Sequence, residues 1–442
     1  MTHTADQSDL VVAKFGGTSV ANAEQLRKVA RIIAADPCRR VIIPSAPGKE
    51  HPDDTKITDL LYLAHELAIN RQNIDGVWTN IEKRFWGIVE DLGLKCPLQK
   101  HLDLARDTIV NGADIHYAAS RGEALNGHIV ADLLDAEYVD AADIIRFAPG
   151  RRLDPISYDL VRARLSDSGR YVIPGFYGAD EGGRVHTFSR GGSDVSGAIT
   201  AAALQAKVYE NWTDVSGLLM ADPRIVPGAL VIPEITYREL RELSYMGATV
   251  LHEEAVFPVR SRNIPINIRN TNRPQDPGTM IVSRRDPGPH LITGIAGRAG
   301  FTVFYIEKAL MNTEIGFGRR VLDVFERLGI SYEHSPSGID TLSIVVSDEQ
   351  VGEKKEQVLE DLQRAVQPDD LNAYGNMAMI ATVGMGMNRQ VGTAARLFGA
   401  LAQAGVNIRM IDQGSSEQNI IIGVEADDLK VAIRSIYDAF NV

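Results

Sequence analysis

The stretch Leu10–Ser19, LVVAKFGGTS, decides the fold of the N-terminal half. Its apolar start predicts a short buried strand over Leu10–Ala13, and the pair Gly16 and Gly17 predicts a tight turn directly after it. A helix is expected next, because apolar residues recur at helical spacing from Leu26 to Ile33. Glycines after a strand let backbone N–H groups approach a phosphate closely, and a following helix adds positive partial charge there. The stretch therefore indicates a phosphate-binding turn.

Two further glycine turns lie in the same half of the chain. Pro44–Lys49, PSAPGK, follows the apolar strand Val41–Ile43, and Ser189–Asp194, SRGGSD, precedes an alanine-rich helix over Val195–Leu204. The order strand, helix, strand favours a parallel sheet covered by helices. Three such turns, which include a lysine, an arginine and an aspartate, indicate an enzyme that acts on phosphate groups. Further strands are expected over Tyr171–Ile173 and Val208–Val215, and helices over most of Thr55–Leu134.

The composition is that of an ordinary globular protein with two or three domains. The chain has 442 residues, of which 44% are hydrophobic and 24% are charged, and its net charge is −12. The negative charge argues against a nucleic acid partner, which usually needs a basic face. Cys38 and Cys96 have no CxxC context, so we expect structural thiols and no disulfide scaffold. The ten histidines show no metal-ligand spacing, so no zinc or other protein-held metal site is expected.

The sequence gives no sign of export or of a membrane partner. The polar segment Met1–Asp9 has no apolar signal core, and no apolar run is long enough to span a bilayer. We therefore expect a cytoplasmic protein.

Proline and glycine cluster in two segments, Asn272–Gly278 and Asp286–Pro289. Such clusters mark loops and domain boundaries, so we expect an N-terminal domain over residues 1–285. The remaining chain repeats one pattern, β-α-β-β-α, at a separation of about 75 residues. We expect a first module over residues 300–376 and a second over residues 377–442, the second completed by a strand within residues 290–297.

The expected elements of the two copies are as follows. The first copy has strand Phe301–Met311, helix Arg319–Leu328, strands Ile330–His334 and Thr341–Ser347, helix Gly352–Val366 and a closing strand near Leu371–Gly375. The second has strand Met377–Val383, helix Gly392–Ala404, strands Val406–Ile411 and Asn419–Val424, and helix Asp428–Phe440. A spare strand over Leu291–Ile295 could complete the second copy and tie both copies into one unit.

Lys14, Arg190 and Asp194 are the strongest candidates for chemistry. A lysine between a strand and two glycines can neutralise the charge that develops on a transferring phosphoryl group. The alternative is a solvated lysine beside a structural turn. Arg190 presents a planar fork that suits a carboxylate, and Asp194 could hold Mg²⁺ or orient Lys14. The alternative for these two is a helix-capping aspartate beside a solvated arginine.

Other segments give weaker signals. Ser120–Glu123, SRGE, could bind a substrate ammonium group through its carboxylate, although a surface glutamate at a helix start explains the pattern better on its own. Trp212–Val215 and Ala221–Arg224 put polar groups at the end of a strand, where ligands bind in open α/β sheets, and ordinary turn chemistry is the alternative. Gly294–Gly300 matches a dinucleotide fingerprint only loosely and is expected to be a loop. The methionines expected to fill the core are Met379, Met385 and Met387.

Taken together, these motifs resemble those of the aspartate kinases, which phosphorylate the side-chain carboxylate of L-aspartate with ATP. The N-terminal part resembles the amino-acid-kinase fold, and the C-terminal repeat resembles a tandem pair of ACT domains, which are small ligand-binding modules. The resemblance covers nearly the whole chain and implies an α/β fold: a three-layer catalytic domain with a mainly parallel sheet, followed by two α+β modules. The matching motifs are Lys14–Ser19, Ser45-Ala46, Gly122-Glu123, Arg190–Asp194 and Trp212–Val215.

The resemblance also implies a role for each matched residue. Lys14 and Asp194 would be catalytic, with Lys14 stabilising the transferred phosphoryl group. Arg190 would hold the α-carboxylate of aspartate, and Glu123 its ammonium group. The amino-acid pocket would be lined by Ser45, Phe176 and Ser193. ATP, with Mg²⁺, would lie against Lys14, Gly16, Gly17, Thr213, Asp214, Asp222 and Arg224.

Two positions depart from the family pattern. Many members carry a tyrosine after the Thr-Asp-Val-x-Gly segment, where this chain has Leu219, and many carry a lysine where it has Thr249. Both changes remove contacts on the nucleotide side. The four residues assigned above to catalysis and to the aspartate backbone are all present, so we expect an active kinase.

The C-terminal repeat would be regulatory. ACT pairs typically assemble across a homodimer, so we expect a homodimer or a dimer of dimers, with L-lysine or L-threonine as feedback inhibitor. The chain ends after the repeat, so no fused homoserine dehydrogenase is expected. The candidate effector residues are Asn312, Phe317, Ser337 and Asp340 in the first copy, and Asn407, Ile408, Gln413 and Glu417 in the second.

Two other functions stay open at this point. Another enzyme of the amino-acid-kinase fold, acting on glutamate, acetylglutamate, carbamate or a nucleotide, would share the Lys14 turn, although Arg190 with Glu123 and the tandem repeat argue against it. A non-catalytic amino-acid sensor built on an inactive kinase fold would fit Leu219 and Thr249.

Overall fold

The computed structural model describes residues 9–440 except 166–167, 190, 249–250, 252 and 289, with the side chains of residues 253 and 254 also outside the description. The described residues form two compact units. The first takes in the chain up to residue 218 together with residues 231–237 and 251–285. The second takes in residues 219–230, 238–248 and 286–440.

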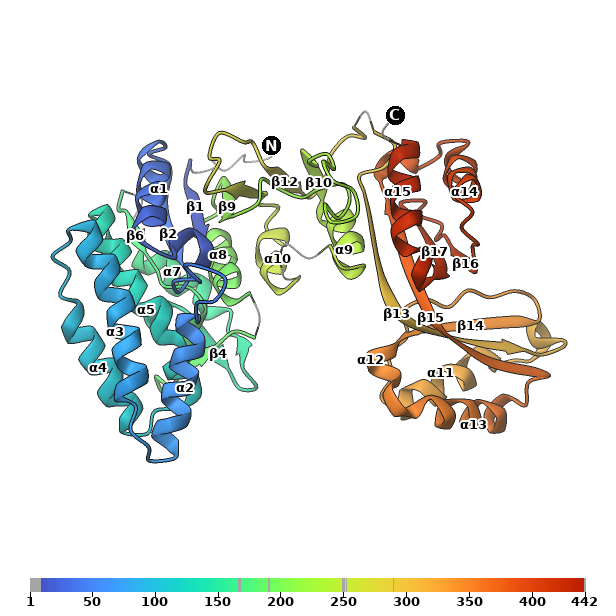
Figure 1. Cartoon of the computed structure of the whole chain (residues 1–442), viewed down its shortest axis with the longest axis horizontal. Helices are drawn as coiled ribbons and strands as arrows, with labels where there is room; N and C mark the ends of the chain where they lie inside the picture. Colours follow the sequence, from blue (N-terminus) through green and yellow to red (C-terminus); the bar gives the residue numbers. More distant parts are fainter. Residues whose placement is uncertain are drawn as a thin grey trace, which may run out of the picture. The chain divides into compact units, whose positions relative to one another are not determined.

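The first unit is built on an eight-stranded sheet with β1 in its interior (Figure 1). The strand order is β10-β12-β11-β9-β1-β2-β6-β3, and all neighbours pair in parallel except β11 and β12. All five residues of β1 are buried, as expected for an inner strand of a parallel sheet. The strands are β1 (Val11–Phe15), β2 (Arg39–Pro44), β3 (Glu137–Tyr138), β6 (Tyr171–Val172), β9 (Val208–Thr213), β10 (Glu234–Thr236), β11 (Ile266–Asn270) and β12 (Thr279–Val282).

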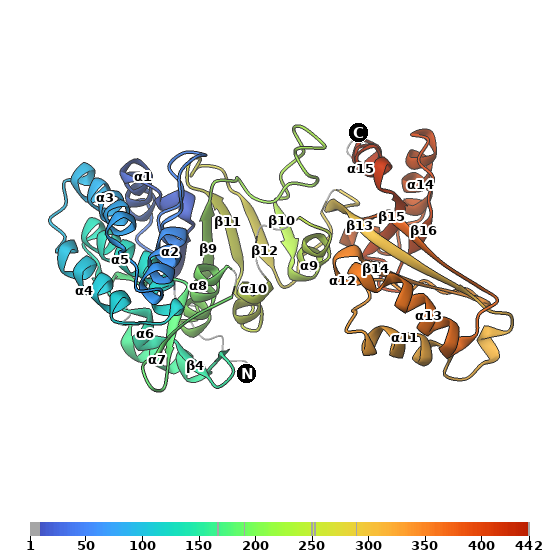
Figure 2. The same ribbon diagram turned by 60° about the horizontal axis from the view of Figure 1, so that its bottom comes forward.

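Helices cover both faces of this sheet, which gives three layers (Figures 1 and 2). On one face, five helices pack with Ala13 and Phe15 of β1 into one apolar core. On the other face, α8 contacts β1 and packs with α7 and α10. This arrangement confirms the predicted fold class of the N-terminal half. The helices are α1 (Ala23–Ala34), α2 (Ile57–Ile69), α3 (Asp75–Leu92), α4 (Leu98–Val110) and α5 (Ile115–Leu134) on the first face, and α7 (Ile156–Arg164), α8 (Gly192–Ala203) and α10 (Glu253–Arg260) on the second.

A smaller sheet completes the first unit. Its strand order is β5-β4-β7-β8, and the short helix α6 (Ala141–Ile144) packs against β7. The strands are β4 (Arg146–Ala148), β5 (Arg152–Leu153), β7 (Tyr177–Asp180) and β8 (Val185–Thr187).

The second unit contains a five-stranded antiparallel sheet in the order β14-β13-β15-β17-β16. Two long strands, β13 (Gly294–Glu307) and β15 (Asp370–Val383), pair along their whole length (Figure 2). The other strands are β14 (Thr341–Ser347), β16 (Met410–Asp412) and β17 (Asn419–Glu425). The helices are α9 (Tyr237–Tyr245, with all but its first residue in this unit), α11 (Phe317–Arg327), α12 (Asp348–Val351), α13 (Lys355–Val366), α14 (Thr393–Gln403) and α15 (Leu429–Phe440).

The prediction of a loop over Gly294–Gly300 is wrong, because this segment is the first half of β13. Tertiary pairing decides the outcome: Gly294 lies opposite Val383 in β15, and the register continues from there. Its glycines serve close packing, since a Cβ atom at Gly297 would lie 3.0 Å from the Leu429 side chain. Of the expected strands Leu291–Ile295 and Phe301–Met311, only residues 294–295 and 301–307 are in a strand, and both belong to β13.

Two other expected strands are mostly missing from the part of the chain that the structure describes. Ile330–His334 contributes only an isolated bridge between His334 and Val345. Of Val406–Ile411, only the last two residues lie in β16. Both segments run along sheet edges, where few backbone groups find a partner strand, so apolar alternation alone overestimates their length. In contrast, the expected strands Leu371–Gly375 and Met377–Val383 merge into β15.

The thiols and methionines behave much as expected. Cys38 and Cys96 are both free, and burial raises the pKa of the Cys96 thiol to about 11. Met379 and Met387 are buried, whereas Met385 is only partly covered. Across the described segments, none of the helices combines the length and apolar character needed to cross a membrane.

Gly278 is the backbone position that tests this fold most directly. It has a φ of +71°, and a Cβ atom there would lie 1.9 Å from the carbonyl oxygen of Ile268 in β11. We expect Gly278→Ala to lower the free energy of unfolding by more than about 2 kcal/mol, because the clash adds to the cost of the left-handed conformation. Urea denaturation measures the loss.

Gly150→Ala is the matched control. Gly150 has a φ of +79° but nothing within 4 Å of the added methyl, so only the conformational cost of about 1 kcal/mol applies. Equal losses in the two variants would contradict the close approach of Gly278 to β11.

Candidate active site

The centre of the site is a buried ion pair between the ends of β1 and α8. Lys14 Nζ lies 2.6 Å from Asp194 Oδ1, and the two side chains are only 10% and 12% exposed. Asn211, which lies opposite Lys14 in β9, donates from Nδ2 to the same carboxylate oxygen at 2.9 Å. Sheet pairing and the first turn of α8 thus fix a lysine ammonium group next to a carboxylate.

The predicted glycine turns contact each other beside this pair. The N–H of Gly16 donates to the carbonyl of Trp212 at 2.9 Å, and the N–H of Gly48 donates to the carbonyl of Gly17 at 2.9 Å. A Cβ atom at Gly48 would lie 2.7 Å from Gly17, so only glycine fits there. Arg84 of α3 donates from Nη2 to the Gly48 carbonyl at 2.6 Å and so holds the second turn against the first.

A pocket of about 210 Å³ opens next to the ion pair. This volume is below the range of about 300–1,000 Å³ that is usual for drug-sized ligands, so it suits a small metabolite. Six elements or turns contribute to it, which brings together most of the predicted substrate residues. The lining residues are Lys14, Ser45, Thr58, Glu123, Phe176, Gly191, Gly192, Ser193 and Asp194.

Glu123 of α5 supplies a second buried carboxyl group to the pocket, with only 6% of the residue exposed. Burial raises the pKa of Glu123 to about 7, although backbone N–H groups and the nearby charges of Lys14 and Arg121 lower it in part. Among the described residues, no group donates a hydrogen bond to its Oε2 atom. A buried carboxyl oxygen without a donor suits a ligand that brings its own cationic donor.

Phe176 forms one wall of the pocket in an unusual backbone conformation. Its φ is +79°, and the conformation is held by a hydrogen bond from its N–H to Ser196 Oγ at 3.0 Å and by one from the Phe188 N–H to its carbonyl. A Cβ atom at Gly192 would lie 2.4 Å from the Phe176 ring, so the glycine turn and this wall fit each other. A strained residue held in this way is typical of a functional site.

Several predicted residues lie elsewhere or outside the description. Arg190 and Thr249 lie outside the described residues. Thr213 and Asp214 end β9 in the first unit, where the Asn270 side chain donates to the Asp214 carbonyl at 3.2 Å. Asp222 and Arg224 belong to the second unit and pair with each other at 2.6 Å, and the Arg224 guanidinium holds the pKa of Asp222 below its usual value.

The candidate effector residues of the first copy lie around the start of α11. Asn312 is in a short 3-10 helix, and Phe317 is the buried first residue of α11. The Asp340 carboxylate accepts the N–H of Leu310 at 2.9 Å, and Ser337 bridges to Leu342. In the second copy, the four candidates lie in the loops that flank β16, where Glu417 accepts the N–H of Arg389 at 2.6 Å; they are Asn407, Ile408, Gln413 and Glu417.

Two residues at the pocket or its turns, Thr58 and Arg84, lie in no recognisable sequence motif. Thr58 follows the first residue of α2 and lines the pocket, but no motif marks it. Arg84 lies 36 residues from the carbonyl of Gly48 that it binds, so its role depends on tertiary packing. Gly191 and Gly192, in contrast, lie in the motif Ser189–Asp194, where the glycine pair predicts the turn.

Comparison with known proteins gives the family. The model of the amino acid kinase family matches residues 9–270, and an ACT domain model matches residues 380–440. Aspartokinase 3 of Bacillus subtilis is 39% identical, over 97% of this chain and 98% of that protein. The crystal structure of Clostridium acetobutylicum aspartate kinase, described as an allosteric enzyme, has a TM-score of 0.90 and 49% identity over 98% of this chain and 100% of that chain.

Two structures of Escherichia coli aspartokinase III are also similar, each at 25% identity. One, in complex with aspartate and ADP, has a TM-score of 0.72 and covers 97% of this chain and 99% of that chain. The other, in complex with lysine and aspartate, has a TM-score of 0.74 and covers 98% and 100%. With its catalytic fold, its pocket and these relatives, the chain belongs to the aspartokinases of the amino acid kinase family.

Proposed function

We propose that this chain is an active kinase that transfers the γ-phosphoryl group of ATP to the side-chain carboxylate of L-aspartate, which yields 4-phospho-L-aspartate. The observation that carries the proposal is the Lys14–Asp194 pair, which faces the same small pocket as the Glu123 carboxyl group, whose Oε2 atom has no donor among the described residues. This reaction would be the first step toward lysine, threonine and methionine. A cytoplasmic location is part of the proposal, since ATP and aspartate are cytoplasmic metabolites.

The residues divide between the two substrates. Lys14 neutralises charge on the transferring phosphoryl group, and Asp194 orients it. Glu123 receives the ammonium group of aspartate and Arg190 its α-carboxylate, while Ser45, Phe176 and Ser193 shape the pocket. The acceptor carboxylate is ionised at neutral pH, so positioning and charge neutralisation suffice without a strong general base. Gly17 would offer its backbone N–H to the phosphates, whereas the N–H of Gly16 already donates to the Trp212 carbonyl and fixes the turn. The other proposed nucleotide-binding residues are Thr213 and Asp214 in the first unit and Asp222 and Arg224 in the second.

The site also fits Mg²⁺ bound mainly by the nucleotide. Mg²⁺ usually takes one or two protein carboxylates together with phosphates and waters, and Asp194 offers one carboxylate. The described residues contain no cluster of three or more His, Cys, Asp or Glu side chains that would hold a metal by itself. When bound, Mg²⁺ would neutralise phosphate charge.

The second unit would carry the regulation. We assign residues 1–285 to the catalytic domain, 300–376 to the first ACT domain and 377–442 to the second, with residues 290–297 completing the second. The pairing of Gly294–Ala296 with Ala381–Val383 supports that last assignment. L-Lysine or L-threonine would bind at the candidate effector residues, and the lysine complex of the Escherichia coli enzyme supports an amino-acid effector.

A homodimer or a dimer of dimers is the proposed assembly. Three large apolar residues of the first copy are unusually exposed: Leu310 at 70%, Ile315 at 97% and Ile339 at 70%. Exposed apolar side chains gathered in loops favour an interface.

The test of the proposal is formation of aspartyl hydroxamate from ATP, Mg²⁺, L-aspartate and hydroxylamine, with and without L-lysine and L-threonine. Hydroxamate that falls with one effector supports both the kinase and its regulation. No hydroxamate from aspartate with folded protein would contradict the proposal, and glutamate or acetylglutamate as acceptors would then test another amino-acid kinase.

Lys14→Met tests the role of the ammonium group. We expect kcat to fall by about 10²–10³-fold, because a charge aimed at the transferring group is lost, while the KM for aspartate changes little. Lys100→Met, at an exposed position of α4, is the control and should retain full activity. A Lys14→Met enzyme with kcat within about threefold of the wild type would contradict the assignment.

Glu123→Gln tests the ammonium site through pH. Only the ionised carboxylate attracts the ammonium group, so kcat/KM for aspartate should rise with pH and level off above about 7 in the wild type. The glutamine variant should lack this rise and show roughly a thirtyfold higher KM for aspartate, which corresponds to the loss of about 2 kcal/mol. The same pH profile in both enzymes would contradict the role of Glu123.

The free energy of unfolding of the wild type and of Glu123→Gln gives a second test of the same substitution. The pKa of Glu123 is raised from its ordinary value of 4.5 to about 7, so between these pH values the folded state holds a proton that the unfolded state releases. The wild type should therefore lose stability relative to Glu123→Gln as the pH rises from 4.5 to about 7. Urea denaturation across this range measures the difference without any substrate.

A further inference from the structure

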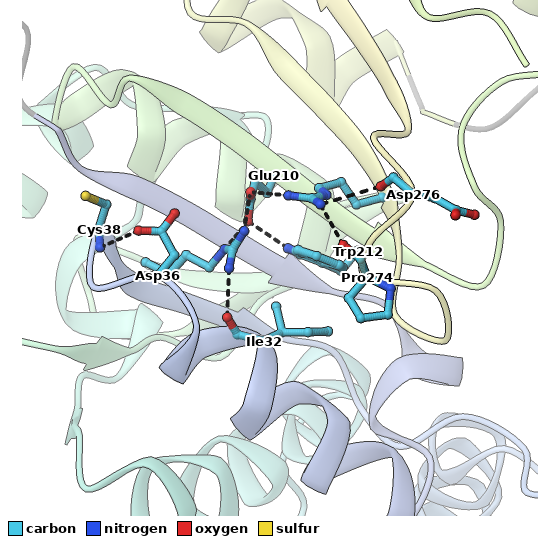
Figure 3. A network of polar contacts seen from close by, with 9 residues as sticks. Ile32, Asp36, Cys38, Glu210, Trp212, Pro274 and Asp276 are labelled. Carbon is cyan, nitrogen blue, oxygen red and sulfur yellow. Dashed lines mark hydrogen bonds and ion pairs between the residues drawn. The ribbon is translucent and has the colours of Figure 1, made fainter.

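Behind the glycine turn, β9 carries a buried polar network centred on Glu210 (Figure 3). Arg39 of β2 binds both carboxylate oxygens, with Nε at 2.7 Å from Oε2 and Nη2 at 3.0 Å from Oε1. The indole N–H of Trp212 donates to Oε2 at 2.8 Å, and Arg269 of β11 approaches Oε1 at 3.3 Å. The Glu210 side chain is 5% exposed, so one buried carboxylate joins β9 to β11 and, across β1, to β2.

The network fixes the ring of Trp212. The guanidinium carbons of Arg39 and Arg269 lie 5.3 and 4.6 Å from its ring centroid. The ring also stacks on Phe15 of β1, with centroids 5.9 Å apart and an interplanar angle of 14°. Cation–π and stacking contacts of this kind hold an aromatic ring in one orientation. Trp212 is therefore immobilised at the end of β9, next to the end of β1.

The network reaches the turn Gly16–Ser19 by two routes, one through Trp212 and one through Arg269. The Trp212 carbonyl accepts the N–H of Gly16 at 2.9 Å and the hydroxyl of Ser19 at 3.5 Å. Arg269 also donates to the carbonyl of Pro274 at 2.7 Å and so holds the loop after β11. Thr271 in that loop donates from Oγ1 to Ser19 Oγ at 2.7 Å. The start and the end of the turn Gly16–Ser19 are thus both tied to Glu210.

We propose that Glu210, Trp212 and Arg269 are positioning residues, which hold the turn Gly16–Ser19 so that the N–H groups of Gly17 and Thr18 meet the nucleotide phosphates. The inference rests on the proposed function, because it takes that turn as the phosphate site. Lys14 and Asn211 face α8, whereas Glu210 and Trp212 face the opposite side of the sheet, so these residues act without touching substrate. The aspartate pocket depends on α5, α8 and Phe176 and should be much less affected.

The choice of variants follows from the charges. Glu210→Gln would leave two buried guanidinium groups without a carboxylate, so that variant risks misfolding. Arg269→Met keeps the Arg39–Glu210 pair intact and removes the contacts of Arg269 to Glu210, to the loop and to the ring. Trp212→Phe removes the indole N–H. Trp78→Phe is its matched control, since Trp78 is also buried but its Nε1 has no hydrogen-bond partner among the described residues.

The experiment measures the Kd for ADP with Mg²⁺ by calorimetry, and the KM for ATP and for aspartate, in the wild type and the three variants. We expect Arg269→Met and Trp212→Phe to raise the Kd for ADP and the KM for ATP by about tenfold, because small displacements of positioned groups are costly. In these two variants the KM for aspartate should change less than about threefold. Trp78→Phe should change none of the three constants. Thermal denaturation reports any general loss of stability in all three.

Two outcomes would overturn the inference, and they are distinguishable. If the wild type binds ADP and both network variants bind it equally well, or if Trp78→Phe weakens binding as much as Trp212→Phe, the network has only a structural role. If the wild type binds no ADP and forms no aspartyl hydroxamate, the proposed function fails and the inference fails with it.

Discussion

The buried ion pair between Lys14 and Asp194 is the interaction on which the rest of the site depends. Charges this deeply buried need an opposite charge and hydrogen bonds. Lys14 and Asp194 each supply the opposite charge, and Asn211 donates a hydrogen bond to Asp194. The pair can form only if β1 and β9 keep their observed register and the first turn of α8 lies beside the end of β1. The parallel sheet is therefore the frame that brings a lysine at position 14 to an aspartate at position 194.

The residues around this pair fall into a pocket and a supporting network. Beside the end of β1, residues from α8 and from α5 together line the pocket with its buried Glu123, whose raised pKa is the energetic consequence of a carboxyl group kept ready for a cation. On the face of the sheet opposite α8, the network of Glu210 reaches the glycine turn through backbone carbonyls. Arg84 provides a separate support by holding Gly48 against Gly17. The turn is rigid because neighbouring elements hold it from several sides, although its own sequence is rich in glycine.

Much of this could be predicted from the sequence, because the motifs are local. Lys14, Glu123 and Asp194 each lie in a short pattern of glycines and polar residues, and the strand–turn–helix order around β1 is visible as apolar periodicity. What could not be predicted depends on contacts between distant segments. The continuity of β13 through Gly294–Gly300 requires the partner strand β15, and the roles of Arg84 and Glu210 require neighbours from other elements. A glycine-rich segment is predicted to be a loop when its partner strand is not known.

We propose that the carboxylate of Asp194 is needed to hold Lys14 for phosphoryl transfer. The most direct measurement is the kcat of Asp194→Asn in the hydroxamate assay, together with its circular dichroism and melting temperature. Asparagine keeps the shape and the contact with Asn211 but removes the charge that faces the ammonium group. We predict that kcat falls by about 10²-fold or more in a protein that remains folded. A folded Asp194→Asn enzyme with a kcat close to that of the wild type would contradict the account.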